Sequence, residues 1–189
     1  MGKPVPGHDV VVIDPKGNPK PPNEEGAIAV RAPDPVMFLK YWDDPGATEA
    51  KFNGNWLLTG DVGTVDEDGY LYFVGRDDDV ITSAGYRIGP GEIEDSLMGH
   101  PAVALAAAIG KPDEVRTEIV KAFIILADGF EANDALAKDI QHHVRIRLAA
   151  YEYPREIEFV RELPMTTTSK IMRRELRLRE ADKQKDQNQ

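Results

Sequence analysis

Short apolar runs alternate with turn signals through the first 74 residues. Residues 8–14 and 26–31 have the β-branched composition of strands, and they predict a hairpin joined by a proline-rich loop. An Asp66–Gly69 turn precedes an aromatic run at 70–74, which also predicts a strand. A short helix at 44–52 fits between these elements. Many short strands and turns predict a small antiparallel sheet, or part of a barrel.

Three adjacent carboxylates, Asp77 to Asp79, interrupt this pattern. They repel one another and favour water, so an exposed joint is expected. A loop containing Gly85 follows, and beyond it the pattern alternates between helices and strands. The predicted helices are 90–98, 133–150 and 171–181. The predicted strands are 102–109, whose alanines would also permit a helix, 119–126 and 155–160. Residues 163–170 are a predicted loop and 183–189 a frayed tail. The fold class expected is α+β, with an antiparallel β part first.

Composition excludes several classes of protein. The formal net charge of -10 over 189 residues argues against non-specific nucleic-acid binding, which needs a surplus of basic residues. Basic residues do gather in 170–179, which could meet one anionic ligand. The absence of cysteine excludes disulfides and thiolate metal sites. Without a bilayer-length apolar run or a signal-peptide pattern, no membrane span and a cytoplasmic location are expected.

Three short motifs occur in order along the chain. They are Trp56-Leu-Leu-Thr-Gly-Asp61, then Gly75-Arg76-Asp-Asp78 continued by Gly85-Tyr-Arg87-Ile and Glu92-Ile-Glu94, then Pro164-Met-Thr-Thr-Thr-Ser-Lys170 with Arg173-Arg174.

Taken singly, the motif residues have ordinary structural interpretations. Asp61 could cap a turn, Arg76 could form a surface ion pair of little energetic value, and Lys170 could be a solvated lysine. The aromatic side chains of 70–74 are expected in the core rather than against a ligand. The order of the motifs favours the functional interpretation of Asp61, Arg76 and Lys170.

The ordered set resembles the adenylate-forming superfamily, and within it the medium-chain or acetate-type acyl-CoA synthetases. The resemblance implies two half-reactions. A carboxylate attacks ATP to give an acyl-adenylate and pyrophosphate, and the thiol of coenzyme A then displaces AMP. ATP, AMP and coenzyme A are thus implied as substrates, with Mg²⁺ accompanying ATP and no metal ligand in this chain. A large domain binds ATP and the acid, and a small mobile C-terminal domain serves each half-reaction.

The resemblance also implies domain bounds and residue roles. Residues 1–76 would be the last β-rich part of the large AMP-binding domain, part of a distorted barrel; 77–182 the mobile domain; and 183–189 a disordered tail. The implied roles are ribose binding for Asp61 and Arg76, a phosphate contact for Arg87, the hinge for Asp78, the coenzyme A channel for Ser83, Ala84 and Gly85, and catalysis for Lys170.

The sequence departs from the family pattern in two ways. Ser169 replaces the glycine that usually precedes the catalytic lysine, and positive φ there would cost on the order of 1 kcal/mol. No Ser/Thr/Gly-rich phosphate loop precedes Asp61, so the expected partner is a missing N-terminal portion of the synthetase, and no complete turnover is expected alone. Alternatives are a non-catalytic nucleotide- or CoA-binding module, a carrier-protein-loading adenylation fragment, and a truncated product.

Overall fold

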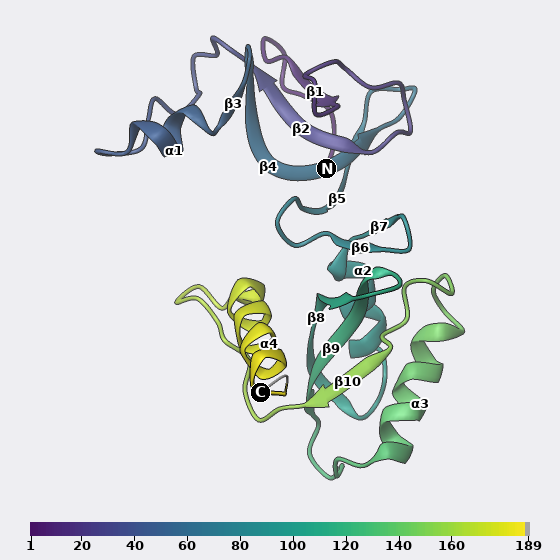
Figure 1. The fold of residues 1–189 in the computed structure, drawn as a ribbon. Helices are drawn as coiled ribbons and strands as arrows, with labels where there is room; N and C mark the ends of the chain where they lie inside the picture. The colour runs from purple at the N-terminus through teal and green to yellow at the C-terminus, as the bar shows by residue number, and fades with distance from the viewer. Residues whose placement is uncertain (188–189) are drawn as a thin grey trace. The chain divides into compact units, whose positions relative to one another are not determined.

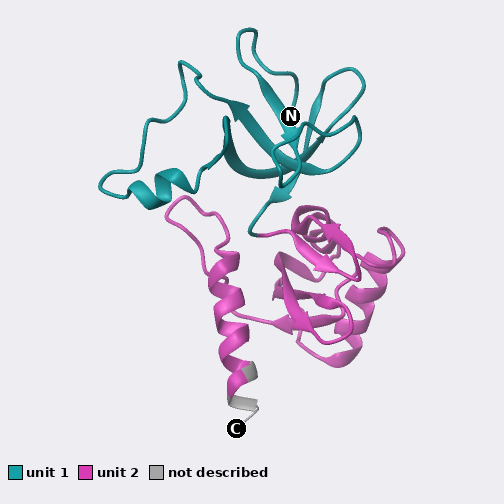
Figure 2. Cartoon of the chain, turned by 45° about the horizontal axis from the view of Figure 1, so that its top comes forward, with its two compact units in different colours: residues 1–78 teal, residues 79–189 magenta. Residues whose placement is uncertain are grey.

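The computed structural model describes residues 1–187 and divides the chain into two compact units. Unit 1 is Met1–Asp78 and unit 2 begins at Asp79 (Figure 2). Each unit contains its own antiparallel-rich sheet (Figure 1). Within residues 1–187, no helix is both long enough and apolar enough to cross a bilayer.

Unit 1 is built on a curled five-stranded antiparallel sheet. Its elements are β1 (Val10–Ile13), β2 (Gly26–Arg31), α1 (Pro45–Glu49), β3 (Phe52–Asn53), β4 (Trp56–Val65) and β5 (Leu71–Arg76). The strand order is β1-β2-β4-β3, and β5 also pairs with β4. Register shifts occur where β4 pairs with β2 and with β5, and such irregularities bend a strand. The long β4 is visibly curved (Figure 1), which confirms the expected part of a barrel.

The sheet of unit 1 has two small apolar clusters, whose members alternate along β1 and β2 as side chains do on opposite faces of a strand. Val12 and Ile28 belong to one cluster, and Ile13 and Ala29 to the other. These clusters cover only parts of the sheet. The prediction that the aromatic side chains of residues 70–74 are buried is wrong, because Tyr70, Tyr72 and Phe73 are each about half exposed.

Unit 2 is a three-layer α+β structure. Its elements are β6 (Ile81–Ser83), β7 (Tyr86–Ile88), α2 (Pro90–Met98), β8 (Val103–Asp113), β9 (Thr117–Leu126), α3 (Asp134–Arg145), β10 (Glu156–Phe159) and α4 (Arg173–Gln187). The sheet has the order β10-β9-β6-β7, with β8 on β9 and only β10 parallel to its neighbour. The predicted α+β fold class is confirmed.

The helices of unit 2 cover both faces of its sheet (Figure 1). On one face, Leu97 of α2 and Val144 of α3 pack with alternate residues of β8 and β9. On the other face, Leu176 of α4 packs with Ile109 and Phe123. The helix α4 is thus held against the sheet by a separate apolar cluster.

Several boundaries differ from the sequence prediction; β8, for example, runs to Asp113 rather than ending at residue 109. The loop expected after the acidic joint contains the β6–β7 hairpin. The helix α3 ends at Arg145 rather than near residue 150, because a turn closed by Glu152 accepting from Ala149 N–H redirects the chain. The tail expected from residue 183 is helical to Gln187, and Lys183 is tethered to Glu158 at 2.6 Å. The remaining tail residues, 188 and 189, lie outside the described residues.

Candidate functional site

Asp61 and Arg76 are brought together by strand pairing. They are cross-strand partners on β4 and β5, and Arg76 Nη1 donates to Asp61 Oδ1 over 2.9 Å. Gly60 has a φ of +85°, and a Cβ built there would lie 2.8 Å from Arg76 Nη2. The missing side chain of Gly60 therefore makes room for the guanidinium group as well as permitting the backbone conformation.

A cavity of about 220 Å³ lies beside Asp61 within unit 1. Gly60, Asp61, Asp77 and Lys51 line it, together with small apolar side chains. A carboxylate and an ammonium group on one small cavity can accept from hydroxyl groups and attract an anionic group. Sequence reasoning missed Lys51, which follows α1 and belongs to none of the three motifs.

The acidic joint is only partly exposed. Asp77 and Asp78 are exposed as predicted, and Asp78 Oδ1 lies 3.6 Å from Arg76 Nε. Asp79 contradicts the prediction, because its side chain is only 13% exposed and is paired with Arg173 and Arg177 of α4. The joint therefore ends at a residue that is anchored rather than solvated.

Ser83, Ala84 and Gly85 form the tip of the β6–β7 hairpin. Ser83 pairs with Tyr86, and the two residues between them have φ values of 51° and 86°. Positive φ at both central positions is what a tight type I′ hairpin turn requires. Ala84 N–H also donates to the Arg116 carbonyl over 2.8 Å, which ties the tip to the neighbouring loop.

Arg87 extends from β7, opposite Thr82, and is exposed. It lies two residues after Gly85, on the same hairpin as the three predicted channel residues. The structure thus brings four of the predicted site residues onto one element of unit 2.

Lys170 lies in an exposed, internally hydrogen-bonded turn. Thr166 N–H donates to the Lys170 carbonyl over 2.8 Å, and Lys170 N–H donates to Thr166 Oγ1 over 3.1 Å. Ser169 has a φ of +59°, so a non-glycine residue occupies the left-handed region at this position. The backbone is therefore strained at Ser169, as expected if this position requires a positive φ.

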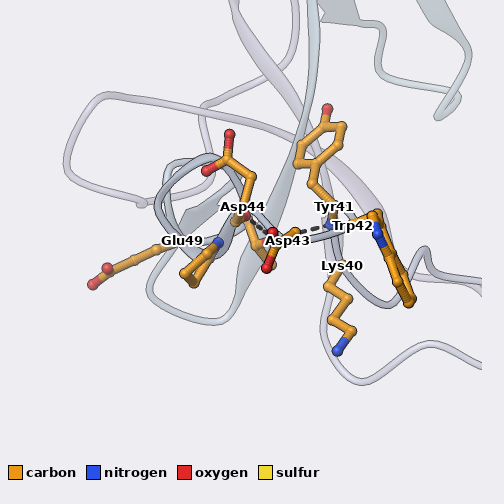
Figure 3. Close-up of a pocket in the computed structure, with 8 residues that line it drawn as sticks. Lys40, Tyr41, Trp42, Asp43, Asp44 and Glu49 are labelled. Atoms are coloured by element: carbon orange, nitrogen blue, oxygen red, sulfur yellow. Dashed lines mark hydrogen bonds between the residues drawn. The ribbon is translucent and has the colours of Figure 1, made fainter.

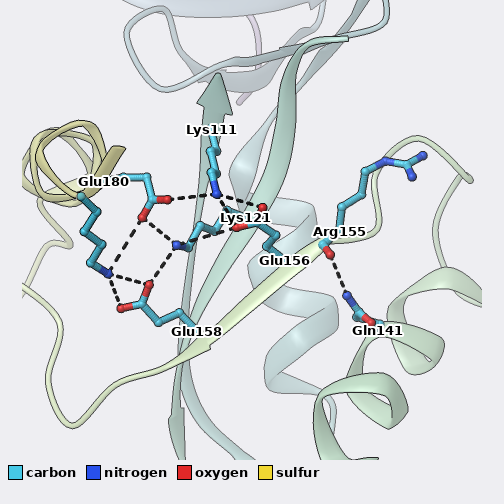
Figure 4. Close-up of polar contacts among 8 residues, drawn as sticks. Lys111, Lys121, Gln141, Arg155, Glu156, Glu158 and Glu180 are labelled. Carbon is cyan, nitrogen blue, oxygen red and sulfur yellow. Dashed lines mark hydrogen bonds and ion pairs between the residues drawn. The ribbon is translucent and has the colours of Figure 1, made fainter. Parts of the chain in front are cut away.

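A group of three lysines and three glutamates fixes α4 to the sheet (Figure 4). Lys121 of β9 and Glu180 of α4 are both buried and lie 2.6 Å apart. Burial opposes the charge on Glu180, but Lys121 and then Lys111 outweigh it, so the pKa of Glu180 is lowered. We call this group the α4 charge cluster; its members are Lys111, Lys121, Glu156, Glu158, Glu180 and Lys183.

The α4 charge cluster was not predicted. Its members come from β8, β9, β10 and α4, and the most distant pair, Lys111 and Glu180, is 69 positions apart in the sequence. The alternation of Glu156 and Glu158 along one predicted strand was the only local signal available.

A larger cavity, of about 510 Å³, lies away from the predicted site residues, on a single segment of unit 1. Residues 40–45, 48 and 49 line it, and their side chains spread in several directions rather than converging (Figure 3). Trp42 is 92% exposed there. Size alone therefore does not identify the site, and the smaller cavity beside Asp61 has the better chemical match. Within residues 1–187, no three His, Asp or Glu side chains gather as a metal site would require.

Comparison with known proteins identifies part of unit 2. Residues 92–170 match the family described as the AMP-binding enzyme C-terminal domain. This segment is therefore similar to an AMP-binding enzyme C-terminal domain. The matched segment ends at Lys170 and includes α2, the β8–β9 pair, α3 and β10.

Relatives extend the similarity beyond the AMP-binding enzyme C-terminal domain. Over 185 residues the chain is 50% identical to human mitochondrial acyl-coenzyme A synthetase ACSM1, covering 95% of this chain and 32% of that protein. Over 180 residues it is 47% identical to the uncharacterized acyl–CoA ligase YtcI of Bacillus subtilis, covering 95% and 34%. The chain thus spans about a third of the length of these relatives.

A solved structure has a similar fold. The anthranilate CoA ligase AuaEII, in complex with anthranoyl-AMP, aligns with a TM-score of 0.82 and 40% identity over 95% of this chain and 34% of its own. Acyl-CoA synthetases and an adenylate-forming ligase are therefore the proteins to which both units are similar.

Proposed function

We propose that this chain is part of an acid–CoA ligase, which activates a carboxylic acid with ATP and transfers the acyl group to coenzyme A. The observation that supports this most strongly is the 50% identity to an acyl-CoA synthetase over 185 residues that include both units. In the proposed reaction, a carboxylate oxygen attacks the α-phosphorus of ATP and pyrophosphate leaves. The thiolate of coenzyme A then attacks the acyl carbon and AMP leaves.

Asp61 and Arg76 would hold the ribose of the nucleotide. The carboxylate of Asp61 can accept from both ribose hydroxyl groups, and Arg76 fixes its orientation through the 2.9 Å bond. The adjoining 220 Å³ cavity gives this pair a concave surface, and Lys51 adds a positive charge to it. This geometry favours nucleotide binding over the interpretation of Asp61 as a simple turn cap.

Lys170 would act in the adenylation half-reaction. Its ammonium group is exposed at the tip of an ordered turn, where it could bridge the acid and the α-phosphate and offset the charge that develops during transfer. Arg87 would contact phosphate with its forked donors. The tight turn at Ser83, Ala84 and Gly85 would line the path of the pantetheine arm, and the chain around Asp78 would be the hinge.

Partners and location follow from the same proposal. The phosphate loop and acyl pocket would come from a larger N-terminal portion, so we propose that the 189 residues alone do not complete a turnover. Mg²⁺ would arrive with ATP. A cytoplasmic location remains a prediction, because some relatives are named as mitochondrial.

ATP–pyrophosphate exchange tests the proposed function. The chain is assayed alone and joined to the nucleotide-binding portion of a longer acyl-CoA synthetase, with short- and medium-chain acids. The joined protein should exchange label and form an acyl-CoA, whereas the chain alone should not. If the joined protein exchanges label but transfers the acyl group to a carrier protein and not to coenzyme A, the proposed acceptor is wrong and the carrier protein takes its place. If the joined protein folds but shows no ATP–pyrophosphate exchange, the proposed function is rejected.

A further inference from the structure

Two arginines of α4 hold the carboxylate of Asp79. Arg173 Nη1 donates to Oδ2 over 3.2 Å, and Arg177 Nη1 donates to Oδ1 over 2.9 Å. Residues four apart lie on the same face of a helix, so one face of α4 presents both guanidinium groups. The first residue of unit 2 is thereby fixed to the helix that begins three residues after Lys170.

Arg173 also joins α4 to the interior of unit 2. Its Nε and Nη2 donate to the two oxygens of Glu94 on α2, over 3.0 and 2.6 Å, in the bidentate arrangement that fixes both groups in orientation. Glu94 is buried and accepts in turn from Ala108 N–H of β8 over 2.9 Å. Arg173 therefore connects Asp79, α2, β8 and α4. We call Asp79, Glu94, Arg173 and Arg177 the α4 clamp.

The turn that carries Lys170 closes directly beside this clamp. Met172 N–H donates to the Pro164 carbonyl over 2.8 Å, and Met165 pairs with Ile171. The two ends of the turn therefore meet at the residue preceding Arg173. A displacement of Arg173 would be passed to both ends of the turn, since no flexible spacer separates them.

We propose that Arg173 is a positioning residue for Lys170, and that the α4 clamp makes the segment after Asp78 and the Lys170 turn move as one body. The inference rests on the proposed role of Lys170 in adenylation. Arg173 touches neither substrate nor Lys170 in this arrangement. Its effect is to fix the position of the Lys170 turn relative to Asp79 at the start of unit 2.

The α4 charge cluster provides a matched comparison. It anchors the same helix through Lys121 and Glu180, but it lies further along α4 than the clamp and contacts neither Asp79 nor Glu94 in the interactions described. If the clamp only attached α4 to the sheet, weakening either group would have the same consequence for the Lys170 turn. If it positions Lys170, only the clamp would affect that turn.

Hydrogen–deuterium exchange of the 189-residue chain tests the inference without relying on activity. Arg173→Lys keeps the charge but loses the bidentate bond, and it should raise exchange about tenfold in both 78–81 and 164–172. Asp79→Asn should raise exchange in the same two segments and serves if Arg173→Lys fails to fold. Glu180→Gln should raise exchange in 118–124 and 156–160 and leave the first two segments unchanged.

The outcomes separate this inference from the proposed function. If folded Arg173→Lys leaves hydrogen–deuterium exchange in 164–172 unchanged, the proposal that the clamp positions the Lys170 turn is overturned. An equal rise in that segment for Glu180→Gln would also overturn it. In the joined enzyme, Arg173→Lys should lower the kcat of adenylation about tenfold with little change in KM for ATP. If the hydrogen–deuterium exchange results are as expected but Lys170→Ala leaves adenylation intact, the α4 clamp is supported and the proposed role of Lys170 is rejected.

Discussion

Two of the non-glycine residues with positive φ lie in the candidate site. Ser169 has a φ of +59° in the Lys170 turn, and Ala84 has a φ of 51° at the hairpin tip. Ala84 is proposed to line the path of the pantetheine arm, and Ser169 directly precedes Lys170. The strain at Ser169 has a local compensation, because Ser169 N–H donates to the Thr166 carbonyl over 3.0 Å and closes the turn.

Ser169→Gly is expected to stabilise the chain by about 1 kcal/mol, because glycine pays no steric penalty in the left-handed region. In the joined enzyme the same change should also raise adenylation. Urea unfolding measures the first effect and pyrophosphate exchange the second. Thr168→Gly is the control, since Thr168 has no positive φ and should lose stability. Equal losses for both variants would show that the turn is not strained at Ser169.

Gly60→Ala tests the packing beneath Arg76. The added Cβ would lie 2.8 Å from Arg76 Nη2 and would require an unfavourable positive φ, so it should displace the guanidinium group from Asp61. We expect AMP affinity to fall at least as much as for Arg76→Ala, as measured by calorimetry on the joined enzyme. Gly69→Ala is the control, because it has a similar φ of +82° with open space around the position of its Cβ. Unchanged AMP binding in folded Gly60→Ala would contradict the proposed ribose contact.

Sequence reasoning predicted the residue-scale features that depend on local pattern. The resemblance implied that Asp61 and Arg76 bind one ribose, which agrees with their direct contact, and the missing glycine indicated the strain at Ser169. It did not predict Lys51 or the anchoring of Asp79. Those depend on tertiary contacts, which three adjacent aspartates in a sequence do not reveal.

At the scale of elements, α4 is distinguished by how it is attached. Its apolar contact with the sheet is small and centres on Leu176, whereas its charged residues make ion pairs along its length. Buried ion pairs add little net stability but are costly to break singly, because the remaining partner stays buried without its counter-charge. The attachment of α4 is therefore sensitive to single charge changes.

Lys121→Met should destabilise unit 2 by about 3 kcal/mol, because Glu180 would remain buried with less compensation. Combining it with Glu180→Met should recover most of that loss, since two lysines and two glutamates of the cluster then remain. Urea unfolding of the two single variants and the double variant measures the coupling between them. Additive losses would show that the pair does not act as a unit.

The α4 charge cluster also predicts a dependence on pH. The pKa values of Glu158 and Glu180 are lowered in the folded chain from an ordinary value of 4.5. Their contribution is therefore complete above about pH 4.5 and is lost as the pH falls through the lower folded values. Glu180→Gln should show a smaller loss of unfolding free energy than the unaltered chain as the pH falls below 4.5. A constant difference between the two proteins across that range would contradict this.

Elements were predictable where the pattern was regular. Residues 90–98 and 26–31 were assigned with the bounds that the structure gives to α2 and β2, since proline, glycine and the apolar spacing mark their ends. The β6–β7 hairpin was not, because each strand has only three residues and its turn uses Ala84 where glycine or asparagine is usual. The end of α4 was missed because charged contacts with β10, rather than an apolar stripe, hold its later turns.

At the scale of the whole molecule, the chain contains two compact units that meet between Asp78 and Asp79. The proposed hinge residue is the last of unit 1, and the residue after it is held by two arginines of unit 2. The unit boundary therefore lies between an exposed residue, Asp78, and one that is anchored within unit 2, Asp79. The hinge role of Asp78 remains a prediction.

Asp78→Pro should test that prediction. Proline restricts φ, so it should impair the change between half-reactions more than nucleotide binding. In the joined enzyme, we expect AMP affinity within about twofold of the unaltered protein and a larger fall in acyl-CoA formation. Asp78→Ala is the control, because it removes the same side chain without restricting φ. Full rates in both half-reactions for Asp78→Pro would place the hinge elsewhere.

The central claim is that Lys170 serves adenylation in an enzyme completed by a larger nucleotide-binding portion. The most direct measurement is ATP–pyrophosphate exchange in the joined enzyme with Lys170→Ala, alongside thioester formation from supplied acyl-adenylate. Removal of a preorganised charge at the reacting group should lower exchange by about 10²-fold or more while thioester formation continues. Exchange at the unaltered rate in a folded Lys170→Ala enzyme would contradict the claim.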